Sequence, residues 1–192
     1  MKLTRDTLVF KPVTMTEWPD MQQLFGPNGA DGGCWCMWWR IKRSEFDRNH
    51  GEANRGAMEA IIRSGEVPGL LAYLEDDPIG WCSVAPREVF PVLDRSPVLK
   101  RIDDQPVWSI VCFYIARRHR RCGLEGLLVE AALDYARSRG ATIVEAYPVD
   151  RETRQFDPGS AFTGTIGTFQ KLGFEEVARR SKRRAILRCR LG

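Results

Sequence analysis

Residues 107–140 read VWSIVCFYIARRHRRCGLEGLLVEAALDYARSRG and carry the clearest structural signal in the chain. Residues 107–116 are apolar almost throughout and rich in β-branched and aromatic side chains, which predicts a strand buried on both faces at the middle of a sheet. After the basic loop 117–123, the apolar positions follow one helix face: Leu124, Leu127, Leu128, Ala131 and Tyr135. A basic turn at a helix N-terminus combines free backbone N–H groups, the helix dipole and arginines, so it predicts an anion site.

The 192-residue chain has the composition of a soluble globular protein, with 43% hydrophobic and 28% charged residues. Its length suits one domain, which we expect to span residues 1–192, because no repeat or low-complexity linker divides it. The net charge of +4 favours anionic ligands where arginines gather but does not imply nucleic acid. No apolar run approaches a membrane span and no signal-type segment follows the N-terminus, so we expect a cytoplasmic protein with reduced cysteines.

The segments on either side of residues 107–140 predict a mixed α/β chain. A strand, a helix and a second strand over residues 107–147 imply a parallel pair joined by a right-handed crossover. The segment 86–106 is long for a connection, which indicates a functional flap or further structure. The other expected strands are 8–13, 70–74, 79–84, 177–178 and 185–190, and 150–160 is a polar loop. A short helix capped by Thr14 or Thr16 is expected to carry Trp18, Met21, Leu24 and Phe25, and further helices are expected over 52–64 and 161–172.

Residues 120–125, Arg-Arg-Cys-Gly-Leu-Glu, and residues 171–174, Lys-Leu-Gly-Phe, form two motifs that follow this order of elements. Together they resemble the GNAT superfamily of acyl-CoA-dependent N-acyltransferases. In that family the central strand is followed by an Arg/Gln-x-x-Gly-x-Gly/Ala turn that opens a helix. Arg120 and Gly123 match this pattern, whereas Glu125 stands where the family has glycine or alanine. A Leu-Gly-Phe step before the final strands is matched by residues 171–174, Lys-Leu-Gly-Phe. The placement of both motifs makes the resemblance stronger than either motif alone.

The resemblance implies a mixed sheet that splays at its centre, is flanked by helices, and holds acetyl-CoA in the split as co-substrate. The diphosphate would lie on backbone N–H groups of the turn, and the pantetheine arm would pair with the end of the central strand. The implied cofactor-binding residues are Phe113, Tyr114, Ile115, Arg120, Arg121, Cys122, Gly123, Leu124, Glu125 and Gly126. Because a carboxylate repels a diphosphate, the Glu125 side chain either points away, for example toward Arg121, or reduces cofactor affinity.

Acetyl transfer to an amine needs a base for the amine, stabilisation of the oxyanion and an acid for the leaving thiolate. Glu145 is a charge in an otherwise apolar strand, and the resemblance implies that it is the base; solvent exposure or pairing with an arginine are equally open. The family's tyrosine acid is replaced here by Phe169. We therefore expect Tyr147, Tyr114 or a water to supply the proton, or the thiolate to leave unaided.

Residues 34–40, Cys-Trp-Cys-Met-Trp-Trp-Arg, form an unusual aromatic and sulfur cluster. The resemblance places this segment beside the acceptor pocket, so Trp35 and Trp38 are candidate substrate-binding residues. Such a wall would suit an apolar or aromatic acceptor, or a cation over the indole faces. Plain core packing is the alternative.

No metal site is predicted. Cys34 and Cys36 with the distant His50 make a poor zinc set, because zinc sites usually contain Cys-x₂₋₄-Cys pairs. Cys112 lies in the buried strand and is expected to be core, and Cys122 lies in the basic turn without a catalytic role.

The sequence thus predicts an N-acetyltransferase that moves the acetyl group of acetyl-CoA directly to a small-molecule or peptide amine in a ternary complex. A non-catalytic acyl-CoA-binding or regulatory module of the same fold is the main alternative, which Phe169 and Glu125 keep open. Binding of nucleic acid through the basic run 179–184 is a weaker hypothesis, since a solvated hairpin turn is the commoner explanation. The acceptor is not identified, no membrane partner is expected, and a homodimer is left open.

Overall fold

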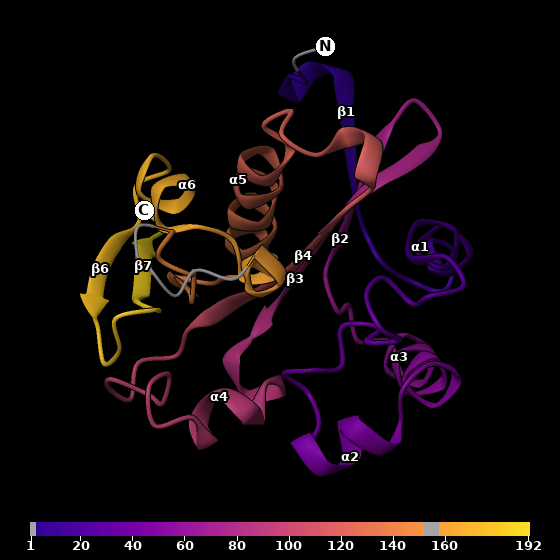
Figure 1. The fold of residues 1–192 in the computed structure, drawn as a ribbon. Coiled ribbons are helices and arrows are strands. Elements are labelled where there is room, and N and C mark those ends of the chain that lie inside the picture. Colours follow the sequence, from indigo (N-terminus) through magenta and orange to yellow (C-terminus); the bar gives the residue numbers. More distant parts are fainter. Residues whose placement is uncertain (1–2, 152–157) are drawn as a thin grey trace.

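A seven-stranded mixed sheet forms the centre of the computed structural model, which describes residues 3–151 and 158–192 (Figure 1). The strand order is β1-β2-β3-β4-β5-β7-β6, and β4 and β5 are parallel while all other neighbours are antiparallel. The strands are β1 (Leu8–Pro12), β2 (Leu70–Leu74), β3 (Asp77–Pro86), β4 (Trp108–Ile115), β5 (Ile143–Ala146), β6 (Glu175–Ala178) and β7 (Ile186–Arg190). The predicted mixed α/β fold with a buried central strand and a parallel crossover is confirmed.

Helices cover both faces of the sheet, and each face has its own apolar cluster. One face carries α1 (Trp18–Phe25), α2 (Arg43–Arg48), α3 (Glu52–Arg63) and α4 (Pro91–Arg95), and the other carries α5 (Leu124–Ser138) and α6 (Ile166–Gln170) (Figure 1). Short 3₁₀ turns are η1 (Arg5–Thr7), η2 (Arg87–Val89), η3 (Arg117–His119) and η4 (Pro158–Thr163). None of the described helices is long and apolar enough to cross a membrane.

Helix α5 packs closely on the sheet because of one glycine in β3. A Cβ at Gly80 would lie 2.9 Å from Leu124 and 3.2 Å from Leu128, two leucines of the apolar stripe. The absent side chain therefore sets the distance between the helix and β3. The stripe read from the sequence is the face that packs, since Leu124, Leu128 and Ala131 are all buried.

The sheet splays between β4 and β5. Only Trp108, Ser109 and Ile110 pair with β5, although β4 continues to Ile115. On the other side of β4, Ser83 faces Cys112 and Val84 faces Ile110, so the residue between them, Val111, has no partner. This β-bulge turns Val111 and Cys112 toward the same apolar cluster and bends the strand. Beyond Ile110, no described strand pairs with the β5-facing edge of β4.

The later elements differ in extent from the expectation. The helix expected over residues 161–172 is divided, because Gly164 has φ +79° and separates η4 from the shorter α6. The segment 86–106 contains η2 and α4 rather than an irregular flap. Residues 152–157 of the expected polar loop lie outside the described residues. The basic run 179–184 forms the connection between β6 and β7, as the hairpin interpretation predicts.

Candidate active site

The turn between β4 and α5 presents an uncapped helix N-terminus. Gly123 is the N-cap with φ +82°, α5 begins at Leu124, and no described side chain caps the helix. Arg121 is also left-handed, with φ +63°, which is uncommon for a residue with a Cβ. The first N–H groups of α5 are therefore free of intrahelical acceptors at the positive end of a 15-residue helix. This geometry suits an anion, as the sequence predicts.

Arginines surround this turn and tie it to the end of β4. Arg120 Nε donates a hydrogen bond to the carbonyl of Ile115 over 3.1 Å. Arg118 pairs with Asp77, whereas no carboxylate in the described part of the chain pairs with Arg117 or Arg121. The turn thus carries unneutralised positive charge next to the unpaired edge of β4, and it brings the predicted residues 113–115 and 120–126 to one place.

Glu125 points away from the turn, which answers the question that the sequence left open. Its Oε1 accepts a hydrogen bond from the backbone N–H of Thr165 over 3.3 Å, and not one from Arg121. Burial raises the pKa of this carboxyl above its usual range, and hydrogen bonds from Thr168 and Thr165 oppose the shift. The carboxylate therefore links α5 to the start of α6 and leaves the N–H groups of the turn accessible.

Glu125→Gln should raise the free energy of unfolding by about 1 kcal/mol at pH 7, because glutamine keeps an acceptor for Thr165 without a desolvated charge. The folded-state pKa is raised, so protonation favours the folded wild type. The difference between the two proteins should therefore shrink as pH falls toward the unfolded-state pKa of about 4.3. Urea unfolding at several pH values measures this, and a difference that grows on acidification would contradict the assignment.

A pocket of about 330 Å³ meets the same part of β4. Cys112, Phe113 and Tyr114 supply its β4 wall, and Phe162 of η4 closes part of it. Trp38 lines this pocket, as the sequence predicts for a substrate-binding residue. The aromatic cluster and the central strand therefore meet at one cavity.

Trp35, the second substrate-binding candidate, lies elsewhere. Its side chain is 5% exposed and packs against Trp18 and Phe25, with ring centroids 5.6 and 5.5 Å away. Trp35 is not among the residues that line the pocket. The structure thus gives Trp35 the core-packing role that was its alternative, and gives Trp38 a place at the cavity.

The polar lining of the pocket includes residues that sequence reasoning did not assign. His50 Nδ1 lies 2.7 Å from the carbonyl oxygen of Gly32. Because a carbonyl only accepts, Nδ1 carries the hydrogen and Nε2 is left with a lone pair while the ring is neutral. Asp31 makes no ion pair with a described residue. The spacing of Phe46 and His50, four residues apart, was an available signal for a shared surface, but nothing in the sequence links them to Phe162.

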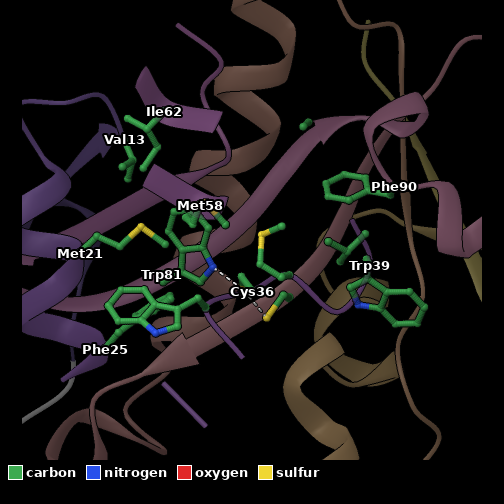
Figure 2. Packing of buried hydrophobic residues seen from close by; sticks show 14 of the residues in the cluster. Val13, Met21, Phe25, Cys36, Trp39, Met58, Ile62, Trp81 and Phe90 are labelled. Atoms are coloured by element: carbon green, nitrogen blue, oxygen red, sulfur yellow. Dashed lines mark hydrogen bonds between the residues drawn. The ribbon is translucent and has the colours of Figure 1, made fainter. Parts of the chain in front are cut away.

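Three thiols border the pocket, and one of them, Cys36, is held by two hydrogen bonds. Cys36 Sγ accepts a hydrogen bond from Trp81 Nε1 over 3.0 Å (Figure 2). Its own S–H donates to Cys112 Sγ over 2.8 Å. The hydrogen bond to Cys36 and burial raise the pKa of Cys112, and burial raises the pKa of Cys34 to about 12. Both thiols are therefore protonated at neutral pH. No group of three His, Cys, Asp or Glu side chains within residues 3–151 and 158–192 is arranged to hold a metal ion.

The two predicted catalytic residues lie together, but in a buried ionic network rather than at the pocket. Glu145 accepts hydrogen bonds from Arg87 Nη1 over 3.0 Å, from Arg188 Nε over 2.8 Å and from the Tyr147 hydroxyl over 2.7 Å. Ser109 also contacts that hydroxyl over 2.8 Å. Burial, then the neighbouring Glu145, raise the pKa of Tyr147. The geometry favours the arginine-paired alternative for Glu145, and catalysis by either residue stays a prediction.

Phe169, at the position of the family's tyrosine acid, is completely buried. Its ring packs between Phe113 and Phe174, with centroid distances of 6.1 and 5.0 Å. Phe169 therefore joins α6 to β4. Tyr114, another candidate acid, is partly exposed and lines the pocket.

Three solved acetyltransferase structures share this architecture at low sequence identity. A GNAT-family acetyltransferase from Streptococcus agalactiae has a TM-score of 0.58 at 10% identity, over 96% of both chains. PaiA N-acetyltransferase from Thermoplasma acidophilum, solved with coenzyme A, has a TM-score of 0.55 at 12% identity, over 96% of this chain and 99% of that one. The yncA protein from Salmonella typhimurium, a putative acetyltransferase solved with its cofactor acetyl-CoA, has a TM-score of 0.53 at 15% identity. The match covers 97% of this chain and 95% of that one.

These identities establish a shared fold alone, and no curated protein matches the sequence. The family model for GNAT acetyltransferases provides evidence at the level of sequence. It matches residues 35–174, which include residues 35–40 of the aromatic cluster, the splayed strand, the basic turn and the Leu-Gly-Phe step. The chain therefore belongs to the acetyltransferase (GNAT) family.

Proposed function

We propose that this protein moves the acetyl group of acetyl-CoA to an amine acceptor by direct transfer in a ternary complex. One observation carries the proposal: Cys112, Phe113 and Tyr114 form a wall of the pocket and also belong to the part of β4 that has no β5 partner. A donor arm on that edge and an acceptor in the pocket would meet at this segment. The presence of CoA and acetyl-CoA in the PaiA and yncA structures supports the choice of donor.

The residues around the splay fit acetyl-CoA. The uncapped N–H groups of residues 121–126 would hold the diphosphate, with Arg117 and Arg121 adding charge. Backbone groups of residues 113–115 would pair with the amides of the pantetheine arm, as an added strand does at a free sheet edge. The orientation of Glu125 toward Thr165 removes the conflict between its carboxylate and the diphosphate.

In the reaction, the amine lone pair attacks the thioester carbonyl, the C–S bond breaks, and one proton moves from the amine while the thiolate gains one. His50 and Tyr114 both line the pocket, and an imidazole nitrogen and a phenol hydroxyl suit these two transfers. A role for Glu145 or Tyr147 would require a proton route out of their buried network. We therefore assign proton removal to His50 and proton return to Tyr114.

Release of free CoA thiol in the presence of an amine panel tests this function. Turnover with at least one amine is expected, whereas tight CoA binding without turnover would identify the non-catalytic module. Tyr114→Phe should lower kcat about tenfold, a modest loss because a thiolate with a pKa of about 8.5 can leave unaided. The KM for acetyl-CoA should stay unchanged. Tyr135→Phe, on the opposite face of the sheet, is the matched control, and an equal loss there would exclude a specific role for Tyr114.

A further inference from the structure

We propose that the acceptor is a primary amine carried on a flat aromatic group by a short flexible arm. This inference rests on the proposed function, because it names the substrate of the same pocket. The pocket supplies two complementary elements for such a molecule, aromatic walls for the ring and an unpaired carboxylate for the ammonium. It also borders the unpaired part of β4, where the acetyl group would be delivered.

The aromatic walls come from separate segments of the chain. Trp38 and Phe46 meet edge to face with centroids 5.1 Å apart, and Tyr114 and Phe162 add further rings. A cavity of about 150 Å³ is enough to hold benzene. The pocket, at about 330 Å³, therefore has room for one ring or a fused pair with a two-carbon arm. Offset and edge-to-face contacts with these walls favour a flat aromatic ligand over a saturated one of equal size.

The charges in the pocket favour a cation and disfavour a carboxylate. Arg43 stacks over Trp38, 4.2 Å from the ring centroid, and its charge is matched by Asp47, with Nε–Oδ1 at 2.7 Å. Asp31 is exposed and has no cationic partner among the described residues, so the unpaired charge among the lining residues is negative. His50 offers a lone pair rather than a positive charge in its neutral form. An ammonium group is therefore attracted, whereas an amino acid would bring a second, repelled charge.

This side of the pocket is held rigidly. The carbonyl of Gly33 accepts hydrogen bonds from the N–H of Gly51 over 3.1 Å and from Asn54 Nδ2 over 3.1 Å, and Asn54 is fully buried. A Cβ at Gly33 would collide with the backbone nitrogen of Gly51. With the bond between His50 and Gly32, these contacts fix the loop that carries Asp31 against the end of α2. A pocket wall that is already ordered lowers the entropy cost of binding a ligand.

The backbone conformation of Trp35 and Cys36 supports a binding role for this pocket. Both residues are left-handed, with φ of +45° and +58°, a conformation that is strained for side chains with a Cβ. The result of this turn is that Trp35 enters the core while Cys36 and Trp38 reach the pocket. Strain of this kind is maintained where the surrounding structure fixes it, commonly at binding sites.

Three amines at saturating acetyl-CoA test the proposal: 2-phenylethylamine, 2-cyclohexylethylamine and phenylalanine. We expect kcat/KM for 2-phenylethylamine to exceed that for 2-cyclohexylethylamine about tenfold, because only the flat ring gains aromatic contacts. It should exceed that for phenylalanine by at least about tenfold, because Asp31 repels the carboxylate. Preference for phenylalanine or for the saturated amine would overturn the assigned class and leave the proposed function intact.

Variants and a binding measurement separate the two hypotheses. Trp38→Leu should raise the KM for 2-phenylethylamine about tenfold, while Trp108→Leu, which removes an indole on the opposite face, should leave it unchanged. Calorimetry of 2-phenylethylamine with CoA-saturated protein gives a readout that needs no turnover. If 2-phenylethylamine binds the wild type and not Trp38→Leu, the pocket is the binding site for this amine, whether or not it is acetylated. If it binds and no amine reacts, the proposed function fails and this inference stands. No binding to the wild type overturns this inference.

Discussion

Gly123→Asp should weaken the binding of CoA by about 100-fold or more and leave the protein folded. The new carboxylate would stand at the N-cap of α5, where we place the diphosphate. It would repel that group and compete with it for the free N–H groups of the helix, each of which makes a charge-assisted bond to a phosphate oxygen. Isothermal titration of CoA measures the change directly.

Two control variants separate charge from strain. Gly140 also has φ +82° and open space around its missing Cβ, but it lies beyond the other end of α5. Gly140→Asp should therefore have a similar conformational cost of about 1–2 kcal/mol and little effect on CoA affinity. Gly123→Asn adds nearly the same shape without the charge, and should retain most of the affinity. Equal CoA affinity in Gly123→Asp and the wild type would exclude the turn as the diphosphate site.

The cofactor half of the site was predictable because its signals are local. The apolar run of β4, the change of period after residue 123 and the glycine between them are adjacent in the sequence, and they predict a strand, a turn and a helix in order. The bulge at Val111 was not predictable, since it depends on how β3 pairs with β4. That bulge is nevertheless what turns Cys112 toward the pocket.

The acceptor half depends on contacts between distant segments, so local sequence patterns could not distinguish among the candidate residues there. Trp35 and Trp38 are chemically alike and three residues apart, and the left-handed backbone at Trp35 and Cys36 is what separates core from pocket. The sequence indicates that Glu145, a charge in an apolar strand, needs a partner or a role. Its arginine partners lie 58 and 43 residues away, so the explanation was visible only in the fold.

Glu145→Gln should lower the free energy of unfolding by about 3–5 kcal/mol, the cost of breaking a buried ion pair. Glu145 is 2% exposed and separates two guanidinium groups, Arg87 and Arg188, which are 1% and 7% exposed. When the Glu145 charge is removed, Arg87 still pairs with Asp94 and Arg188 still pairs with Asp103. Both aspartates are more exposed than Glu145. The neutral amide cannot compensate two buried cations, and its NH₂ group faces donors. Urea unfolding measures the loss.

Glu176→Gln is the matched control, because it removes one carboxylate from an exposed ion pair with Arg179. Its cost should be below about 1 kcal/mol, since solvent screens that pair. A similar loss in both variants would show that burial of the Glu145 network adds little to stability. The contrast tests whether the network, which joins β4, β5 and β7 next to the splay, stabilises that junction.

Glu145→Gln also distinguishes a catalytic role of Glu145 from a purely structural one, when kcat per folded molecule is measured across pH. A catalytic base would be lost, so kcat should fall by about 100-fold or more and the acidic limb of the profile should disappear. A carboxylate that only holds Arg87 and Arg188 in place should leave the pH profile unchanged and kcat within a few-fold. We expect the second result, because His50 lines the pocket and Glu145 does not. His50→Gln, which leaves the buried network intact, should then show the loss of kcat that Glu145→Gln lacks.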